Sequence, residues 1–276
     1  VTGLKASLGD GSWKAFHCDL VVGADGRNSG IARLVEAPMR EFPNERFAVF
    51  AYYDGVTLKS GDNSQFWFFG DKSVFAYPLF KDSVLLCLFL PLSEKDEWLG
   101  DIDEKFLEEY RSLDKAPDLD SAKRSTDFHR MMDMTSCYRN PSGKGVALVG
   151  DAALQSDPMS GIGCGWAILS SYWLFQETRH YVKHPVMRNV GISRYGKLHK
   201  RRLLPHNKFI VQSSFARGHG FLEVLLFKAG ARNQHVADLI GDFVGRKIEV
   251  SEFLSPGNIV RYIAAAALPA RKTAAS

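Results

Sequence analysis

The chain has 276 residues, of which 45% are hydrophobic and 24% charged, and its formal net charge is +4. This balance is typical of a globular protein long enough to bury a sizeable core. No signal peptide is recognisable at the start, and no stretch approaches the roughly 20 apolar residues of a membrane-spanning helix, so we expect a soluble protein without a transmembrane segment.

Four cysteines are spread along the chain without a C-x-x-C pair: Cys18, Cys87, Cys137 and Cys164. In a chain of this length, such spacing predicts reduced thiols and a cytoplasmic location. His180 and His184 have the i, i+4 spacing of two metal ligands on one helix face. Pro185 follows at once and no acidic third ligand is near, so we predict no metal site.

The first predicted elements are two strands, Leu4–Leu8 and Ala15–Val22, separated by the turn signals of Gly9–Ser12. The second strand ends in an apolar run and leads directly into a glycine-containing loop. A short helix is predicted from about Ser29 to Val35.

The middle of the chain contains four apolar or alternating runs, which are Phe47–Tyr53, Gln65–Phe69, Val74–Leu79 and Val84–Leu90. Turn signals separate them at a spacing that predicts an antiparallel sheet. A helix is expected from Asp103 to Leu113, with Asp101 or Asp103 as its N-cap.

The last third begins with a short buried strand, Gly145–Val149, followed by a glycine-rich loop. A long helix is predicted from about Gly163 to Val182. Further helices are expected over roughly 188–242, broken near Pro205 and Gly218, and the tail from Ala264 to Ser276 is expected to fray.

Two glycine-rich loops follow buried strands and then open helices. The first is Asp19–Arg33, with the sequence DLVVGADGRNSGIAR, and the second is Gly145–Ala167, with the sequence GVALVGDAALQSDPMSGIGCGWA. Glycines let backbone approach a ligand closely, and the free N–H groups of a helix start favour anions or electron-rich groups. A carboxylate at a strand's carboxyl end, such as Asp151, can accept hydrogen bonds from ribose hydroxyls.

Both loops resemble signatures of FAD-dependent monooxygenases of the para-hydroxybenzoate hydroxylase type, a superfamily that also contains flavin-dependent halogenases. The first resembles G-A-D-G-x-x-S-x-x-R through Gly23, Ala24, Asp25, Gly26 and Ser29, with Arg33 one position beyond the arginine of that signature. The second resembles G-D-A-A…P-x-x-G-x-G through Gly150, Asp151, Ala152, Ala153, Pro158, Gly161 and Gly163. The two motifs stand in the family's order, with a predicted antiparallel sheet between them.

The resemblance implies an α/β (α+β) fold: an incomplete FAD/NAD(P)-binding Rossmann-like domain with an inserted antiparallel β-sheet substrate domain and C-terminal helices. It divides the chain into FAD-binding segments at 1–36 and 140–185, a substrate domain at 37–139, C-terminal helices at 186–263 and a flexible tail at 264–276. No G-x-G-x-x-G unit precedes the first motif. We therefore expect a truncated C-terminal portion of a longer enzyme, without the cradle for the AMP half of FAD.

The resemblance also implies the residues that bind FAD: Asp25, Gly26, Arg33, Gly150, Asp151, Pro158, Gly161, Ile162, Gly163, Cys164 and Gly165. Asp151 would hold the ribityl chain, and the helix start at Gly163–Gly165 would stabilise charge on the reduced flavin ring. The substrate pocket would be lined by Trp67, Phe69, Phe75, Tyr77 and Pro158. No catalytic acid or base stands out.

The implied reaction is hydroxylation of a small organic substrate through a flavin C4a-hydroperoxide, with NAD(P)H as reductant. One alternative is a flavin-dependent halogenase, although its W-x-W-x-I-P signature would fall on Ser73–Pro78, where only the proline survives. A geranylgeranyl-reductase-like enzyme is another. The alternative of a different class is a non-catalytic remnant that acts as a binding module.

Such a module would use a basic segment, residues 178–222, which contains ten Lys or Arg residues and no Asp or Glu. A block of one charge sign favours an anionic partner, and we expect an acidic carrier protein or an anionic lipid. Nucleic acid is not expected, because the basic residues are not interleaved with stacking aromatics.

Overall fold

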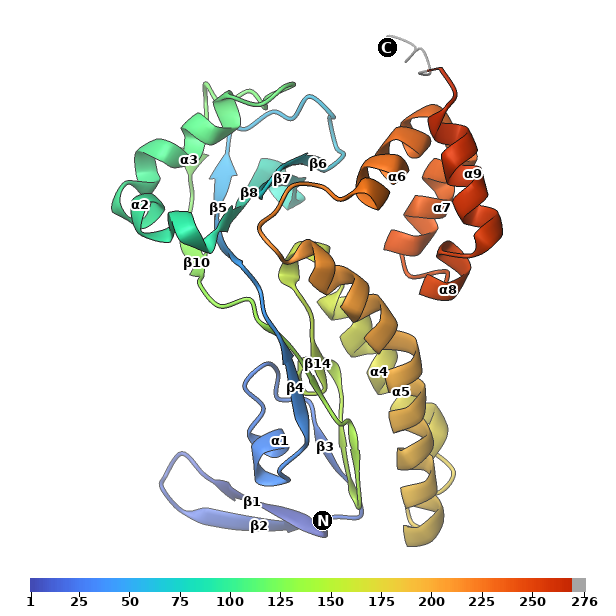
Figure 1. The fold of residues 1–276 in the computed structure, drawn as a ribbon. Coiled ribbons are helices and arrows are strands. Elements are labelled where there is room, and N and C mark those ends of the chain that lie inside the picture. The colour runs from blue at the N-terminus through green and yellow to red at the C-terminus, as the bar shows by residue number, and fades with distance from the viewer. Residues whose placement is uncertain (270–276) are drawn as a thin grey trace. The chain divides into compact units, whose positions relative to one another are not determined.

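The computed structural model describes residues 1–269 (Figure 1), and these residues form two compact units. The first unit consists of Val1–Trp67 and Lys72–Ala216, and the second of Phe68–Asp71 with the described chain from Arg217 onward. Helices and sheets are mixed, as predicted. Within residues 1–269, no helix combines the length and the apolar character needed to cross a membrane.

The elements up to the second motif are β1 (Gly3–Ser7), β2 (Trp13–His17), β3 (Val21–Gly23), α1 (Gly30–Leu34), β4 (Met39–Phe42), β5 (Arg46–Asp54), β6 (Gln65–Phe69), β7 (Lys72–Pro78), η1 (Phe80–Asp82), β8 (Ser83–Pro91), η2 (Leu92–Glu94), α2 (Lys95–Gly100), α3 (Ile102–Arg111), β9 (Lys123–Arg124), β10 (His129–Met131), β11 (Ser136–Arg139), β12 (Ser142–Gly143) and β13 (Val146–Leu148). The remaining elements are η3 (Gly150–Ala152), β14 (Leu154–Gln155), η4 (Pro158–Ser160), α4 (Gly163–Thr178), α5 (Pro185–Ser213), α6 (Phe221–Arg232), α7 (Gln234–Val244), α8 (Val250–Phe253) and α9 (Pro256–Ala266).

A small sheet of order β12-β13-β3 carries both predicted loops. Its strands β3 and β13 are parallel, with Val22 opposite Ala147, so their carboxyl ends lie at the same edge. The single strand predicted over Ala15–Val22 is wrong, because this segment forms two strands. β2 pairs with β1 in an exposed hairpin, and the chain leaves that hairpin before β3 joins β13.

The antiparallel sheet predicted for the middle of the chain is confirmed, with the order β10-β5-β8-β7-β6 and β9 also pairing with β5. One face is covered by α2 and α3 (Figure 1). The predicted helix is confirmed as α3 with Asp101 as its N-cap, whereas α2 was not predicted. Tyr53 stacks on Phe106 of α3 at 6.0 Å between ring centroids. The core on this face contains Val49, Leu86 and Leu88, all fully buried.

The opposite face of the same sheet is rich in aromatic and sulfur-containing side chains. Because side chains alternate along a strand, Phe75 and Tyr77 of β7 both lie here, with ring centroids 6.0 Å apart. Met134 and Met159 pack against this cluster. The second motif therefore contacts the sheet through Met159, one residue after Pro158.

Helices α4 and α5 run side by side in the first unit (Figure 1). A Cβ on Gly191 would lie 2.3 Å from the carbonyl oxygen of Glu177, so the close approach of the two helices requires glycine there. The helix predicted to Val182 ends at Thr178. The predicted break near Pro205 is wrong, because α5 continues through it, with Pro205 exposed on its outer side.

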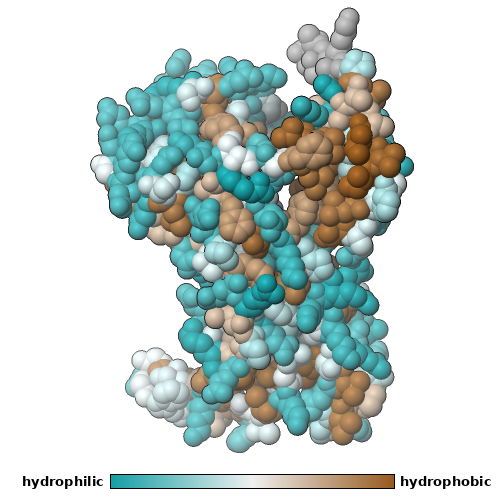
Figure 2. Space-filling view, in the orientation of Figure 1, coloured by the Kyte–Doolittle hydropathy of each residue, from teal (hydrophilic) through white to brown (hydrophobic). Residues whose placement is uncertain are grey.

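The second unit is built around α6, α7, α8 and α9. Phe243 stacks on Phe253 with ring centroids 4.0 Å apart, and the Tyr262 hydroxyl donates to the Phe253 carbonyl at 2.9 Å. Figure 2 shows much of its visible surface as apolar, and Phe221 is 84% exposed. The break near Gly218 is confirmed. Helix α9 extends into the segment predicted to fray, while residues 270–276 lie outside the described residues.

A buried histidine on the inner face of α5 gives the first unit a pH-dependent stability. His199 is fully buried beside Tyr138 and Tyr195, and neither ring nitrogen has a hydrogen-bond partner in the described structure. Burial lowers the pKa of His199 to about 4. The ordinary pKa of histidine is near 6.5, so between these values the unfolded state binds a proton that the folded state does not.

We therefore expect the free energy of unfolding to fall by roughly 1.4 kcal/mol per pH unit from this histidine as the pH drops below about 6.5. His199→Phe keeps an aromatic ring in place and should remove the contribution of this one proton to the pH dependence of the free energy of unfolding. Urea unfolding at several pH values measures it, with the exposed His235→Phe as control. An unchanged slope in His199→Phe would contradict the assignment.

Candidate flavin site

The two predicted loops meet at an open hollow of about 270 Å³ at the carboxyl ends of β3 and β13. The residues that line it come from both loops and from the first three turns of α4: Ala24, Gly26, Val149, Gly150, Asp151, Gly163, Cys164, Ala167 and Ser171. Five of the predicted cofactor residues are thus brought together: Gly26, Gly150, Asp151, Gly163 and Cys164. The others, Asp25, Arg33, Pro158, Gly161, Ile162 and Gly165, lie outside this lining.

The first loop is held in shape by its own side chains. Asp25 accepts hydrogen bonds from the Ser29 hydroxyl at 2.6 Å and the Ile31 N–H at 3.0 Å. Partial burial alone would raise the pKa of Asp25, but these hydrogen bonds outweigh it and hold the pKa below its usual value. The Arg33 guanidinium donates to the Asn28 carbonyl at 2.7 Å. Asp25 and Arg33 therefore fix the start of α1.

The second loop begins at Gly150, which has a φ of 57° and lies against α4. A Cβ on Gly150 would lie 3.1 Å from the Ala167 Cβ, so glycine suits both the left-handed backbone and the close approach. Its N–H donates to the Ser170 hydroxyl at 2.9 Å. The Tyr195 hydroxyl donates to the Leu148 carbonyl at 2.6 Å, which ties β13 to α5.

Asp151 is half-buried beside the start of α4, where a Cβ on Gly163 would lie 3.9 Å from its Oδ1. Within residues 1–269 its carboxylate accepts no hydrogen bond. Burial raises the pKa of Asp151, and the charges of Arg27 and Arg139 partly oppose that rise. This carboxylate is therefore free to accept hydrogen bonds from a ligand's hydroxyl groups.

The start of α4 is open to the hollow. Its N-cap residue, Ile162, supplies no side-chain hydrogen bond, and its first turn contains no acidic residue. Gly163, Cys164 and Gly165 are exposed, so their N–H groups can donate to an electron-rich ligand. These groups are the donors that the sequence motif predicts.

Asp157, which sequence reasoning missed, anchors the segment that leads to this helix. It is 1% exposed. Its carboxylate accepts from the Ser214 hydroxyl at 2.6 Å, the Asn44 amide at 2.8 Å and the Met159 N–H at 2.9 Å. Pro158–Ser160 and Gly161 are thereby tied to the end of α5 and the start of β5.

Arg139 is a second residue that the motifs did not reveal, and it joins the two loops. Its guanidinium donates to the Arg27 carbonyl at 2.9 Å, the Asp151 carbonyl at 3.2 Å and the Ala152 carbonyl at 3.4 Å. A planar guanidinium with several N–H groups can span such a set, whereas one ammonium group cannot. The only sequence signal is its position, just before the strand of the second motif.

Arg139→Lys is therefore expected to lower the free energy of unfolding by about 2 kcal/mol, because hydrogen bonds from a charged group contribute roughly 1.5–3 kcal/mol. It should also loosen the relative placement of the two loops. Chemical denaturation measures the first effect, with Arg130→Lys on the exposed strand β10 as the matched control. Equal stability of both variants would show that Arg139 does not join the loops.

The predicted substrate residues fall into separate groups. Phe75 and Tyr77 lie on the sheet face that contacts Met159. Trp67 lies on the opposite face, where its Nε1 donates to the Asp114 carbonyl at 2.8 Å and its ring contacts Tyr110. Phe69 belongs to the second unit. Pro158 is exposed in η4.

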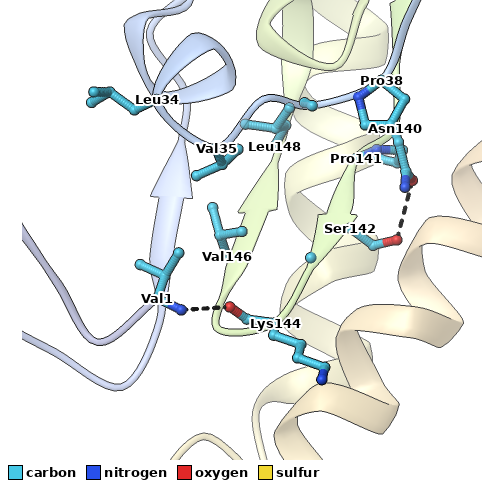
Figure 3. Close-up of a pocket in the computed structure, with 12 residues that line it drawn as sticks. Val1, Leu34, Val35, Pro38, Asn140, Pro141, Ser142, Lys144, Val146 and Leu148 are labelled. Atoms are coloured by element: carbon cyan, nitrogen blue, oxygen red, sulfur yellow. Dashed lines mark hydrogen bonds between the residues drawn. The ribbon is translucent and has the colours of Figure 1, made fainter.

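Two further hollows lie in the first unit. An apolar one of about 250 Å³ shares Val149 and Ser171 with the candidate site and includes Val22 of the edge strand β3. Another, of about 390 Å³, is bounded by Leu34 and Lys144 (Figure 3). None of the predicted site residues lines that third hollow.

The donor set of the candidate site suits an organic cofactor. It offers one carboxylate, exposed backbone N–H groups and glycine-lined surface, which are groups that bind hydroxyls and a planar polar ring. Within residues 1–269, no three His, Cys, Asp or Glu side chains gather where they could hold a metal ion.

Comparisons with known proteins agree with this geometry. A family model described as "FAD binding domain" matches residues 2–178. An uncharacterized protein in two strains of Mycobacterium tuberculosis is 27% identical over 173 residues, which cover 60% of this chain and 46% of that protein. The chain spans about half the length of these curated relatives.

Solved flavoenzymes share the fold. The flavin-dependent brominase Bmp2 aligns with a TM-score of 0.73 and 17% identity, covering 94% of this chain and 65% of that one. The flavin-dependent halogenase CmlS aligns with a TM-score of 0.61 and 16% identity, covering 95% and 52%. PqsL, a probable FAD-dependent monooxygenase from Pseudomonas aeruginosa, aligns with a TM-score of 0.54 and 17% identity, covering 75% and 57%.

Proposed function

The chain belongs to the FAD binding domain family, and from this premise we propose that it forms part of an NAD(P)H-dependent monooxygenase that hydroxylates a small organic substrate. The observation that carries the proposal is the hollow at the carboxyl ends of β3 and β13. There, a carboxylate without a hydrogen-bond partner in the described structure lies beside the uncapped start of a long helix.

The residues present fit FAD. Asp151 would accept hydrogen bonds from the ribityl hydroxyls, and the N–H groups of Gly163–Gly165 would donate to the electron-rich edge of the flavin ring. Bound FAD would supply the redox chemistry, accepting hydride from NAD(P)H and activating oxygen. The protein's task is to hold the ring, place the substrate and exclude water.

The aromatic sheet face supports an apolar or aromatic substrate. Phe66 makes edge contacts with Phe75 at 4.9 Å and with Tyr77 at 5.4 Å between ring centroids. Burial raises the pKa of Tyr77 to about 12, and the neighbouring Cys87 adds to the rise, so its phenol stays protonated at neutral pH. This face therefore offers apolar surface and a hydroxyl donor, and no charged acid or base is assigned.

The proposal is tested by supplying FAD and NAD(P)H to the purified protein and following oxidation of the nicotinamide together with oxygen uptake. Oxygen-18 incorporated into an aromatic test substrate would support hydroxylation. Because the chain spans about half of its curated relatives, the same assay should be run on the protein at the relatives' full length. FAD retention without nicotinamide oxidation in the full-length protein would contradict the monooxygenase proposal.

A flavin-dependent halogenase is the second candidate, favoured by the likeness to the brominase fold. Ser73 and Phe75 stand in β7 where the halogenase signature has tryptophans, and both are buried. This difference supports hydroxylation. Adding bromide to the assay separates the two, because a halogenase gives a brominated product. A geranylgeranyl-reductase-like enzyme would instead reduce a double bond without oxygen uptake.

We also propose a cytoplasmic location. It is supported by the four cysteines, which are all unpaired: Cys18 and Cys164 are exposed, and Cys87 and Cys137 are buried. Alkylation of the thiols in freshly lysed cells tests this directly. Disulfide-linked forms under those conditions would argue against a reducing compartment.

A further inference from the structure

The outer side of α5 carries an open groove that has no part in the candidate flavin site. It has a volume of about 520 Å³ and is lined by Lys197, Lys200, Arg201, Leu204, Pro205 and Lys208. All six residues belong to one helix of the first unit. The four cations are exposed, whereas Leu204 is half-buried.

The charge of this groove is not balanced by its surroundings. Helix α5 contains no Asp or Glu, and in the described structure none of the four lining cations forms an ion pair with a carboxylate. Helix α4 and strand β12 are among the elements packed against α5. The one acid of α4 is Glu177, whose backbone lies at Gly191, about 9 Å along the helix axis from Lys197. β12 is followed by another cation, Lys144.

The groove also has an apolar floor. Leu204 and Pro205 lie between the cations of the preceding turns and Lys208. Pro205 has no N–H group to donate to the Arg201 carbonyl one turn earlier. The surface therefore combines a short apolar strip with charges of one sign on both sides of it.

We propose that this groove docks an acidic amphipathic helix of a protein partner. The cations extend from Lys197 to Lys208, about 16 Å along the axis, which matches three turns of a second helix. Glu or Asp side chains of the partner would pair with the cations, while its apolar stripe would cover Leu204 and Pro205. This surface is additional to the proposed flavin chemistry and does not depend on it.

Other anionic occupants fit the groove less well. A single phosphate or carboxylate ion would contact only one or two of the four cations. Single-stranded nucleic acid needs aromatic side chains for stacking, and the lining has none. A membrane surface needs large apolar side chains that insert beside the cations, whereas the apolar part here is only Leu204 and Pro205.

The test uses the full chain and a fluorescein-labelled synthetic helical peptide that carries a leucine stripe flanked by glutamates. The groove variant replaces Lys197, Lys200, Arg201 and Lys208 by Gln. The matched control replaces four exposed lysines elsewhere by Gln: Lys5, Lys59, Lys115 and Lys123. Both variants lose four positive charges. Comparing them therefore separates binding in the groove from general electrostatic attraction between the protein and the acidic peptide.

We expect the peptide to bind the wild type and the control with similar affinity, and the groove variant at least tenfold more weakly. Leu204→Glu, which places an acid on the groove floor, should also weaken binding of the peptide. Circular dichroism checks that each variant is folded. A scrambled peptide of the same composition that binds equally well, or equal loss in the control variant, would overturn the proposal. Binding to phosphatidylserine vesicles but not to the peptide would assign the groove to lipid and also overturn it.

Discussion

Asp151→Asn is expected to weaken FAD binding by about 10- to 100-fold without unfolding the protein. A hydrogen bond to a charged group contributes roughly 1.5–3 kcal/mol, and 1.4 kcal/mol corresponds to a factor of ten in affinity. The carboxylate accepts no hydrogen bond from the rest of the described structure, so the fold does not depend on it. Equilibrium dialysis of FAD against both proteins measures the change.

The pKa of Asp151 leads to a second prediction for Asp151→Asn, which concerns its stability. Burial raises this pKa, with Arg27 and Arg139 opposing. A raised carboxyl pKa means that the folded state holds the proton to higher pH than the unfolded state, so stability falls as the pH rises through that window. Asp151→Asn should therefore be at least as stable as the wild type at pH 7. A variant that unfolds, or that binds FAD as tightly as wild type, would contradict the role assigned to Asp151.

Asp157→Ala is expected to have the largest effect on stability, lowering the free energy of unfolding by about 4 kcal/mol. The substitution leaves the Ser214 hydroxyl, the Asn44 amide and the Met159 N–H without their common acceptor in a buried place. The segment before α4 would then lose its fixed position. Urea unfolding measures the change.

The control for Asp157 is Asp62→Ala, which removes an exposed carboxylate. That change should alter stability by less than about 0.5 kcal/mol. The loss of unfolding free energy in Asp157→Asn should lie between those of Asp157→Ala and Asp62→Ala. The amide keeps an acceptor oxygen but turns an N–H₂ group toward some of the donors. A loss below about 1 kcal/mol in Asp157→Ala would show that the three hydrogen bonds are not what positions the loop.

The strands and loops of the two motifs could be predicted because local signals agree there. One apolar run ends in Gly-Ala-Asp-Gly and the other in Gly-Asp. The structure places Gly26, Gly150 and Asp151 around one hollow. The antiparallel sheet could be predicted equally well, because the alternation of apolar and polar residues and the turn residues between strands are local sequence signals. The face to which each aromatic side chain points could not be predicted. Trp67 and Tyr77 are both aromatic residues of predicted strands, but they lie on opposite faces of the sheet.

The remaining features depend on contacts between residues far apart in the sequence. Arg139 reaches Arg27 across 112 positions, and Asp157 reaches Asn44 across 113. No local pattern marks either partner. Pro205 was expected to end a helix from its own chemistry, but packing of α5 against α4 maintains the helix through it.

Riboflavin lacks the AMP half of FAD, so its binding shows whether this chain holds the ring and ribityl end of a flavin. The measurement is quenching of riboflavin fluorescence by the purified protein, with and without excess ADP. We expect saturable quenching that excess ADP does not reverse and that Asp151→Asn weakens. Folded protein that leaves riboflavin fluorescence unchanged, or binding that ADP abolishes, would contradict it.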